Sequence, residues 1–169
     1  HSDAKIGLQI GHAGPKASTN APWDHAGMDQ PLPEGNWPLL SASAQPYLPG
    51  GRVPRPMNRS DMDRLISQFV ASTQRAARAG FDWLELHAAH GYLLSSFISP
   101  LTNQRTDEYG GSHENRMRYP LEVIKAIRAA VPEDFIISAR MSFDELRENG
   151  LSPGELLTVA QDIIDSGVD

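Results

Sequence analysis

The stretch ELHAAHGYLLSSFISPLTNQRTDEYGG, residues 85–111, decides how the fold of this chain is interpreted. It begins inside an apolar run, residues 83–86, that predicts a β-strand. His87, His90 and Tyr92 follow directly after that strand. Because the carboxyl ends of parallel strands face the binding crevice of α/β proteins, we expect these two imidazoles and the phenol to converge on a functional site.

Composition sets the bounds on the kind of protein. The 169 residues, 40% of them hydrophobic, suffice for the core of a single domain. A net charge of -6 and scattered arginines argue against a nucleic-acid partner. No apolar run has the length of a membrane-spanning helix, and the amino end does not read as a signal peptide. The absence of cysteine excludes disulfides and thiolate metal sites, and we expect a cytoplasmic protein.

Strand and helix patterns alternate along the chain. Strands are expected at residues 5–10, 83–86 and 135–139, and a further strand at 168–169. Amphipathic helices are expected after three capping residues: Asn58, Ser112 and Ser152. The first should end at Gly80, the second at Pro132 and the third at Gly167, with Pro120 near the first turns of the second helix.

Strand-helix-strand repeats predict a parallel α/β fold, with strands buried on both faces. The dinucleotide fingerprint Gly-x-Gly-x-x-Gly, which would favour a doubly wound sheet, does not join any of these strands to a helix. A TIM (β/α)8 barrel needs roughly 250 residues, so this chain could supply about three of its eight units. We therefore interpret residues 1–169 as the central segment of one barrel domain.

A long loop over residues 15–57 interrupts this pattern. It is rich in Pro, Gly, Ser and Asn, and it contains Trp23 and Trp37. Ordered loops of this length are uncommon and usually functional. Two interpretations stay open: a packed covering loop, with a short hairpin around Gly50 and Gly51, or a lid over the substrate.

Polar side chains end all three predicted strands. These are Gln9 with His12, then His87 with His90 and Tyr92, and then Arg140 with Ser142. In a barrel such ends open onto one mouth, so a shared site is favoured over three separate structural contacts. The competing interpretation is a metal-dependent hydrolase, in which His87 and His90 bind the ion with His12 or Asp144 as third ligand.

The residue types also suit chemistry without a metal. Two neutral imidazoles can each donate a ring hydrogen to one carbonyl oxygen and stabilise the negative charge that develops on it. Tyr92 could then donate a proton. A glutamine such as Gln9 matches the imide edge of a flavin, and an arginine such as Arg140 would favour the negatively charged reduced ring.

Three segments resemble the Old Yellow Enzyme family of FMN-dependent ene-reductases. They are residues 6–14 (IGLQIGHAG), 87–94 (HAAHGYLL) and 99–116 (SPLTNQRTDEYGGSHENR). The resemblance implies a TIM barrel with FMN at the strand ends, reduction of FMN by NADH or NADPH, and hydride transfer from flavin N5 to an activated alkene. It also implies roles for individual residues: Gln9, Arg140 and His87 at the flavin, His87 and His90 at the substrate carbonyl, and Tyr92 as proton donor.

Other segments refine this resemblance. The family commonly has Arg where this chain has Pro15, which leaves the next residue, Lys16, as the substitute. Residues 34–38 and 53–57 resemble the reductase half of salicylyl-CoA 5-hydroxylases and of 2-aminobenzoyl-CoA monooxygenase/reductases. That would imply a larger flavoprotein with an aromatic or enoyl CoA thioester as its small-molecule substrate. Separately, we expect the segment to belong to a longer, homo-oligomeric chain, in which it is either catalytic or only structural. In the 103–112 loop, the charged side chains of Arg105, Asp107 and Glu108 are expected to pair with one another and with Arg116.

Overall fold

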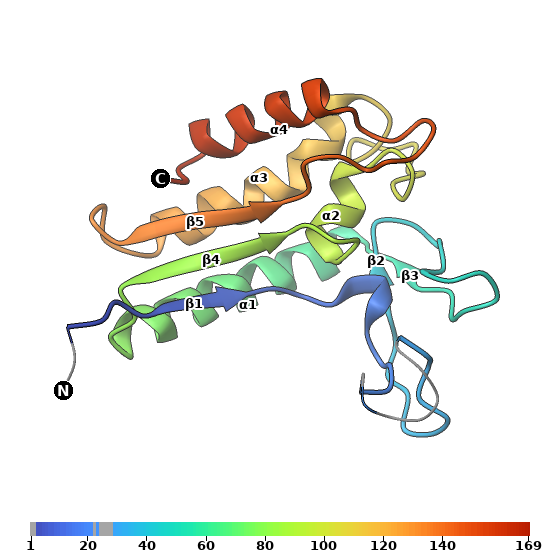
Figure 1. Cartoon of the computed structure of the whole chain (residues 1–169), viewed down its shortest axis with the longest axis horizontal. Helices are drawn as coiled ribbons and strands as arrows, with labels where there is room; N and C mark the ends of the chain where they lie inside the picture. The colour runs from blue at the N-terminus through green and yellow to red at the C-terminus, as the bar shows by residue number, and fades with distance from the viewer. Residues whose placement is uncertain (1–2, 22, 24–28) are drawn as a thin grey trace.

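A computed structural model describes residues 3–21, 23 and 29–169 of the chain. Its main sheet has three parallel strands in the order β1-β4-β5, and all three point the same way (Figure 1). The strands are β1 (Gly7–Ile10), β4 (Trp83–Ala88) and β5 (Ile136–Met141). The predicted α/β class with a parallel sheet is therefore confirmed. Asp169 donates its backbone N–H to the carbonyl of Ile137 (2.9 Å), so the chain after the last helix returns to β5.

Helices connect the strands and cover one face of the sheet (Figure 1). They are α1 (Arg59–Arg78), α2 (Leu93–Ile98), α3 (His113–Ala129) and α4 (Pro153–Asp165), with a short 3-10 helix η1 at Gly14–Lys16. The three predicted capping residues are confirmed, and both Asn58 and Ser152 form reciprocal capping boxes, with Asp61 and Glu155 respectively. None of the described helices is long and apolar enough to cross a membrane.

One expectation about the helices was wrong: Pro120 lies in the interior of α3 and not near its first turns. The helix ends at Ala129 with Ala130 as its cap position, so the expected end before Pro132 is confirmed. The fully buried helix α2 was not predicted, because its six residues are too few to display a helical period.

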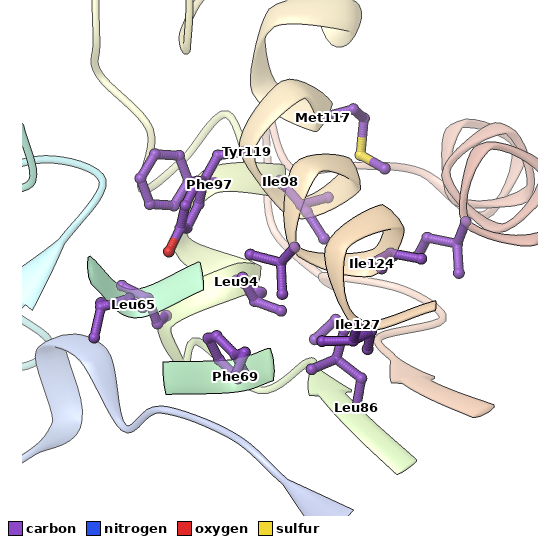
Figure 2. Packing of buried hydrophobic residues seen from close by; sticks show 14 of the residues in the cluster. Leu65, Phe69, Leu86, Leu94, Phe97, Ile98, Met117, Tyr119, Ile124 and Ile127 are labelled. Carbon is purple, nitrogen blue, oxygen red and sulfur yellow. The ribbon is translucent and has the colours of Figure 1, made fainter. Parts of the chain in front are cut away.

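The hydrophobic core lies between the sheet and its helices. Leu84 and Leu86 of β4 are fully buried there, and Leu86 lies close to Phe69 of α1 and Ile127 of α3 (Figure 2). The opposite face of the sheet is only partly covered, since burial alternates along β4. The expectation that the strands are buried on both faces was wrong: every second residue of these strands lies on an open, mostly polar face.

The loop at residues 15–57 also differs from its prediction. Its two short strands, β2 (Leu40–Ser41) and β3 (Arg55–Pro56), pair in parallel, so no hairpin forms between them. Leu39 and Leu40 are buried, as expected of a packed loop, but Trp23 and Trp37 are 83% and 51% exposed. Residues 22 and 24–28 of this loop lie outside the described residues.

Arg105 ties this loop to the segment that follows α2. Its Nη1 donates to the carbonyls of Ala42 (2.9 Å) and Met57 (2.8 Å), and its Nε and Nη2 bind the carboxylate of Asp107. The architectural role expected for Arg105 and Asp107 is confirmed. Arg116 does not join them: its guanidinium donates to the backbone carbonyls of Ile98 and Gly111.

Candidate active site on the open face of the sheet

The register of the sheet places the predicted strand residues on one face. Gln9 of β1 lies opposite Glu85 of β4, and His87 lies opposite Arg140 of β5. Glu85 and His87 are two residues apart in one strand, so their side chains point to the same side. Gln9, His87 and Arg140 therefore meet on the open face, whereas their strand neighbours pack against the helices.

His87 is the centre of this group. It lies inside β4 and not after it, because the strand extends to Ala88, two residues beyond the predicted end. Its ring centroid is 5.1 Å from that of His90 and 4.8 Å from that of Tyr92, and both contacts are edge-on. The three residues picked out by the sequence thus come together.

The protonation of His87 follows from its surroundings. Its Nδ1 accepts the N–H of Ala89 at 3.2 Å, so the neutral ring carries its proton on Nε2. Burial lowers the pKa of His87 below its ordinary value, and the neighbouring His90 and Arg140 lower it further. At neutral pH the side chain is a neutral imidazole with one hydrogen available to a ligand.

A tight turn carries His90 and Tyr92 away from the end of β4. His90 and Gly91 have positive φ angles of 59° and 73°, a left-handed conformation that glycine tolerates best. The His90 N–H donates to Ser142 Oγ after β5 (3.4 Å), and the Gly91 N–H donates to Ser95 Oγ in α2 (3.2 Å). Tyr92 then forms the amino-terminal cap position of α2. Contacts with both neighbouring elements hold the turn.

A cavity of about 320 Å³ opens beside these side chains. Its lining comes from the ends of β1 and β4: Gln9, Gly11, His12, Ala13, His87 and Tyr92. His90 and Arg140 do not line it. A side chain at Gly11 would place a Cβ 3.0 Å from the His87 Cβ, so glycine allows the backbone of residue 11 to lie close to His87.

His12 lines the cavity, and Lys16 lies near Tyr92, another of its lining residues. The Nδ1 of His12 accepts the N–H of Gly14 (3.0 Å), and burial lowers the His12 pKa, with Arg64 as a smaller cause. Lys16 Nζ lies 4.0 Å from the ring centroid of Tyr47 and 5.3 Å from that of Tyr92. The cation thus sits next to the predicted proton donor, in contact with the long loop.

Glu85 is the site residue that the sequence analysis missed. Its Oε1 accepts from Gln9 Nε2 (2.5 Å) and from Arg140 Nε (2.9 Å), and its Oε2 accepts from Arg140 Nη2 (3.3 Å). The hydrogen bonds from Arg140, and then that from Gln9, lower the pKa of Glu85. The sequence did hold a signal: Glu85 stands two residues before His87, so a strand through both puts a carboxylate beside the imidazole.

A metal centre finds no support in the arrangement of these side chains. Asp144, a suggested third ligand, instead accepts the N–H of Leu146 through Oδ1 (2.8 Å). Over residues 3–21, 23 and 29–169, no group of three or more His, Cys, Asp and Glu side chains is placed to hold an ion.

The donors and acceptors of the open face do fit a flavin. With its Nε2 on Glu85, Gln9 keeps its carbonyl oxygen and a second amide hydrogen for a ligand, which is the pattern that an imide edge needs. Arg140 uses Nε and Nη2 on Glu85, so Nη1 remains to face an anionic ring. Gln9 also lines the cavity described above.

A model of a known protein family matches almost the whole chain. The model for the NADH:flavin oxidoreductase / NADH oxidase family matches residues 1–168. The chain belongs to this family. The resemblance to Old Yellow Enzymes is thereby confirmed; the family uses FMN, with NAD(P)H as the reductant.

Relatives span far more sequence than this chain. An NADH:flavin oxidoreductase of Gibberella zeae is 47% identical over 146 residues, which are 84% of this chain and 35% of that protein. An NADPH dehydrogenase of Geobacillus sp. (strain WCH70) is 36% identical over 166 residues, 98% of this chain and 44% of the relative. The chain therefore covers less than half the length of these family members.

Solved structures similar to this chain are also longer than it. Morphinone reductase matches with a TM-score of 0.74 and 26% identity, over 98% of this chain and 46% of its own. 2-Naphthoyl-CoA reductase in complex with 2-naphthoyl-CoA matches with a TM-score of 0.72 and 28% identity, over 78% and 20% respectively. The fold of the chain is thus shared with parts of larger oxidoreductases.

Proposed function

We propose that this protein is an FMN-dependent oxidoreductase that takes hydride from NADH or NADPH and delivers it to a carbonyl-conjugated alkene. Family membership supports FMN as the cofactor and NAD(P)H as the reductant. The polar side chains on the open face of the sheet support the location of the active site. We also propose that β1, β4 and β5 form one arc of a (β/α)8 barrel, since the strands are parallel and their helices cover one side. FMN, when bound, supplies hydride transfer at its N5 atom.

Gln9 and Arg140 bind the flavin in this proposal. When FMN is bound, the Gln9 carbonyl oxygen would accept from the imide N–H, and the remaining amide hydrogen would donate to a ring carbonyl. The guanidinium of Arg140 would favour a negatively charged ring. His87 belongs to both the proposed flavin site and the proposed substrate site. It lines the cavity together with Gln9, and its ring contacts those of His90 and Tyr92.

His87 and His90 hold the substrate carbonyl. The neutral His87 donates from Nε2, the nitrogen that the Ala89 N–H leaves protonated, and His90 supplies a second ring hydrogen. These bonds strengthen as negative charge develops on the oxygen. Tyr92 delivers a proton to the alkene carbon opposite the one that receives hydride.

The contact of the His87 ring with both the His90 and Tyr92 rings, beside the cavity, is the observation that carries this assignment. It supports an ene-reductase over the metal-dependent hydrolase, for which the described residues offer no group of three ligands. The metal alternative also lacks support from the family.

Replacement of the phenol tests the proposed proton donor. Tyr92→Phe is expected to slow reoxidation of the reduced flavin by an enone about a hundred- to ten-thousand-fold, because a general acid is lost. Reduction of the flavin by NAD(P)H should be nearly unchanged. Stopped-flow absorbance measures both half-reactions, and Tyr47→Phe, a phenol outside the cavity lining, is the matched control. An unaltered alkene half-reaction in Tyr92→Phe would remove Tyr92 from this role.

A CoA thioester is the substrate class that we favour. The loop segments 34–38 and 53–57 resemble those of enzymes that act on aromatic CoA thioesters, and a structural neighbour holds 2-naphthoyl-CoA. We expect kcat/KM for an enoyl-CoA to exceed that for the corresponding simple enoyl thioester that lacks the CoA moiety. Equal values for the two would indicate that the protein does not recognise the CoA moiety.

A further inference from the structure

Glu85 occupies the middle of the open face, on the central strand of the sheet. It is the only carboxylate among the described residues that binds both flavin-facing side chains, Gln9 on one neighbouring strand and Arg140 on the other. Its side chain is 23% exposed and that of Arg140 is 50% exposed, so the trio borders the open side of the sheet and not the apolar core.

The chemistry of a carboxylate gives these bonds a direction. An ionised carboxylate only accepts hydrogen bonds, so it can bind Gln9 only through the amide nitrogen. The amide of Gln9 is therefore held with one orientation, in which its oxygen is left for a ligand. A neutral amide at position 85 could bind either end of Gln9, and this constraint would be lost.

Glu85 also sets the charge that a ligand meets at Arg140. Two of the guanidinium nitrogens bind the carboxylate, and the two opposite charges largely compensate each other. Without the carboxylate, Arg140 would present a full positive charge on the same face. Such a charge stabilises an anionic ligand more than a neutral one.

We propose that Glu85 is a positioning residue that orients Gln9 for the flavin imide edge and limits the positive charge of Arg140, so that it sets the reduction potential of the bound flavin. This inference rests on the proposed function, because it requires FMN on the open face. It assigns to a residue that contacts no reacting atom an effect on both the affinity for FMN and its redox balance.

The test compares Glu85→Gln with Glu108→Gln in the FMN-loaded protein. Both changes replace a carboxylate by its isosteric amide, but Glu108 lies on an exposed part of the 103–112 loop. Two quantities are measured: the dissociation constant for oxidised FMN by fluorescence, and the midpoint potential by spectroscopic titration against a reference dye. Neither quantity depends on turnover.

In Glu85→Gln we expect weaker binding of oxidised FMN and a more positive potential than in the wild type. The reduced flavin should gain about tenfold in binding relative to the oxidised form, which is about 30 mV for a two-electron couple. Glu108→Gln should match the wild type in both measurements. Glu85→Asp, which keeps the charge, should shift the potential less than Glu85→Gln.

The outcomes separate this inference from the proposed function. A wild-type protein that binds no FMN overturns both. A wild type that binds FMN, with Glu85→Gln unchanged in potential and affinity, overturns only the role of Glu85. If circular dichroism shows that Glu85→Gln does not fold, Glu85→Asp replaces it in the test. A midpoint potential equal to that of the control Glu108→Gln, together with weaker FMN binding, supports the positioning role. Unchanged FMN binding overturns that role.

Discussion

The chemistry of His87 depends on its place in β4. Because the strand continues to Ala88, the imidazole is held by regular backbone pairing with β5, opposite Arg140. Its Nδ1 is occupied by a backbone N–H, and burial, together with the neighbouring His90 and Arg140, lowers its pKa and so opposes protonation. In the role proposed for His87, a substrate would meet a ring whose tautomer and charge are already set, which would avoid reorganisation when charge develops on the bound oxygen.

His87 should titrate below the ordinary histidine pKa of about 6.5. Since its folded-state pKa is lowered, the unfolded chain takes up its proton first as the pH falls. The stabilisation that depends on neutral His87 is thus complete above the unfolded-state pKa of about 6.5 and declines as the pH falls below it. Ring resonances in an NMR titration measure the pKa directly. In urea unfolding between pH 7 and 5, the wild type should lose more stability than His87→Asn, and a His87 midpoint above 6.5 would contradict the assignment.

The sequence predicted most residues of the candidate site and missed Glu85, which joins Gln9 to Arg140. Gln9, His87, His90, Tyr92 and Arg140 were found because polar residues stood at the predicted strand ends. Glu85 was missed because the strand was expected to stop at residue 86, which hid the alternation that places Glu85 and His87 on one face. A two-residue error in a strand boundary therefore concealed the carboxylate between Gln9 and Arg140.

Among the elements, the helix starts were the most predictable. Asn58, Ser112 and Ser152 bind backbone N–H groups within their own first turns, so local sequence suffices. The exposure of Trp37 and the burial of all of α2 depend instead on contacts with distant segments. Such contacts leave no period in the sequence, and propensity alone could not reveal them.

An unsatisfied polar group lies in the packing between α2 and α3. Tyr119 of α3 is fully buried against Phe97 of α2, with ring centroids 4.6 Å apart (Figure 2). Its hydroxyl has no hydrogen-bond partner among the described residues, and burial raises its pKa. A buried polar group without a partner costs about 1 to 3 kcal/mol.

Tyr119→Phe should therefore raise the free energy of unfolding by about 1 kcal/mol, since it removes the hydroxyl and keeps the ring. Urea denaturation followed by circular dichroism measures the change. Tyr47→Phe is the control: Tyr47 is 40% exposed, so loss of its hydroxyl should change stability by less than about 0.5 kcal/mol. Destabilisation by Tyr119→Phe would show that the hydroxyl is satisfied in solution.

At the scale of the whole molecule, the sheet has one covered face and one open face. Helices α1 and α3 bury the apolar side of the strands, and the polar side carries the candidate site (Figure 1). The α/β class, the parallel order and the family were all accessible from the sequence. The open face was not, because the apolar strands read as buried on both sides, and only the alternation of burial along β4 separates the two faces.

The outer edges of this sheet are the basis of the last prediction. Within the described residues β1 pairs only with β4. β5 pairs with β4 and forms two hydrogen bonds with Asp169, whose N–H donates to the Ile137 carbonyl and whose carboxylate accepts the Ile137 N–H. Unpaired strand edges are templates for association, and Ile136 on the open face is 52% exposed. We expect the 169-residue chain to self-associate, seen as a concentration-dependent sedimentation coefficient. Ile136→Lys should weaken association, whereas Leu157→Lys on the exposed face of α4 should not. A stable monomer at every concentration would show that the edges are protected in solution.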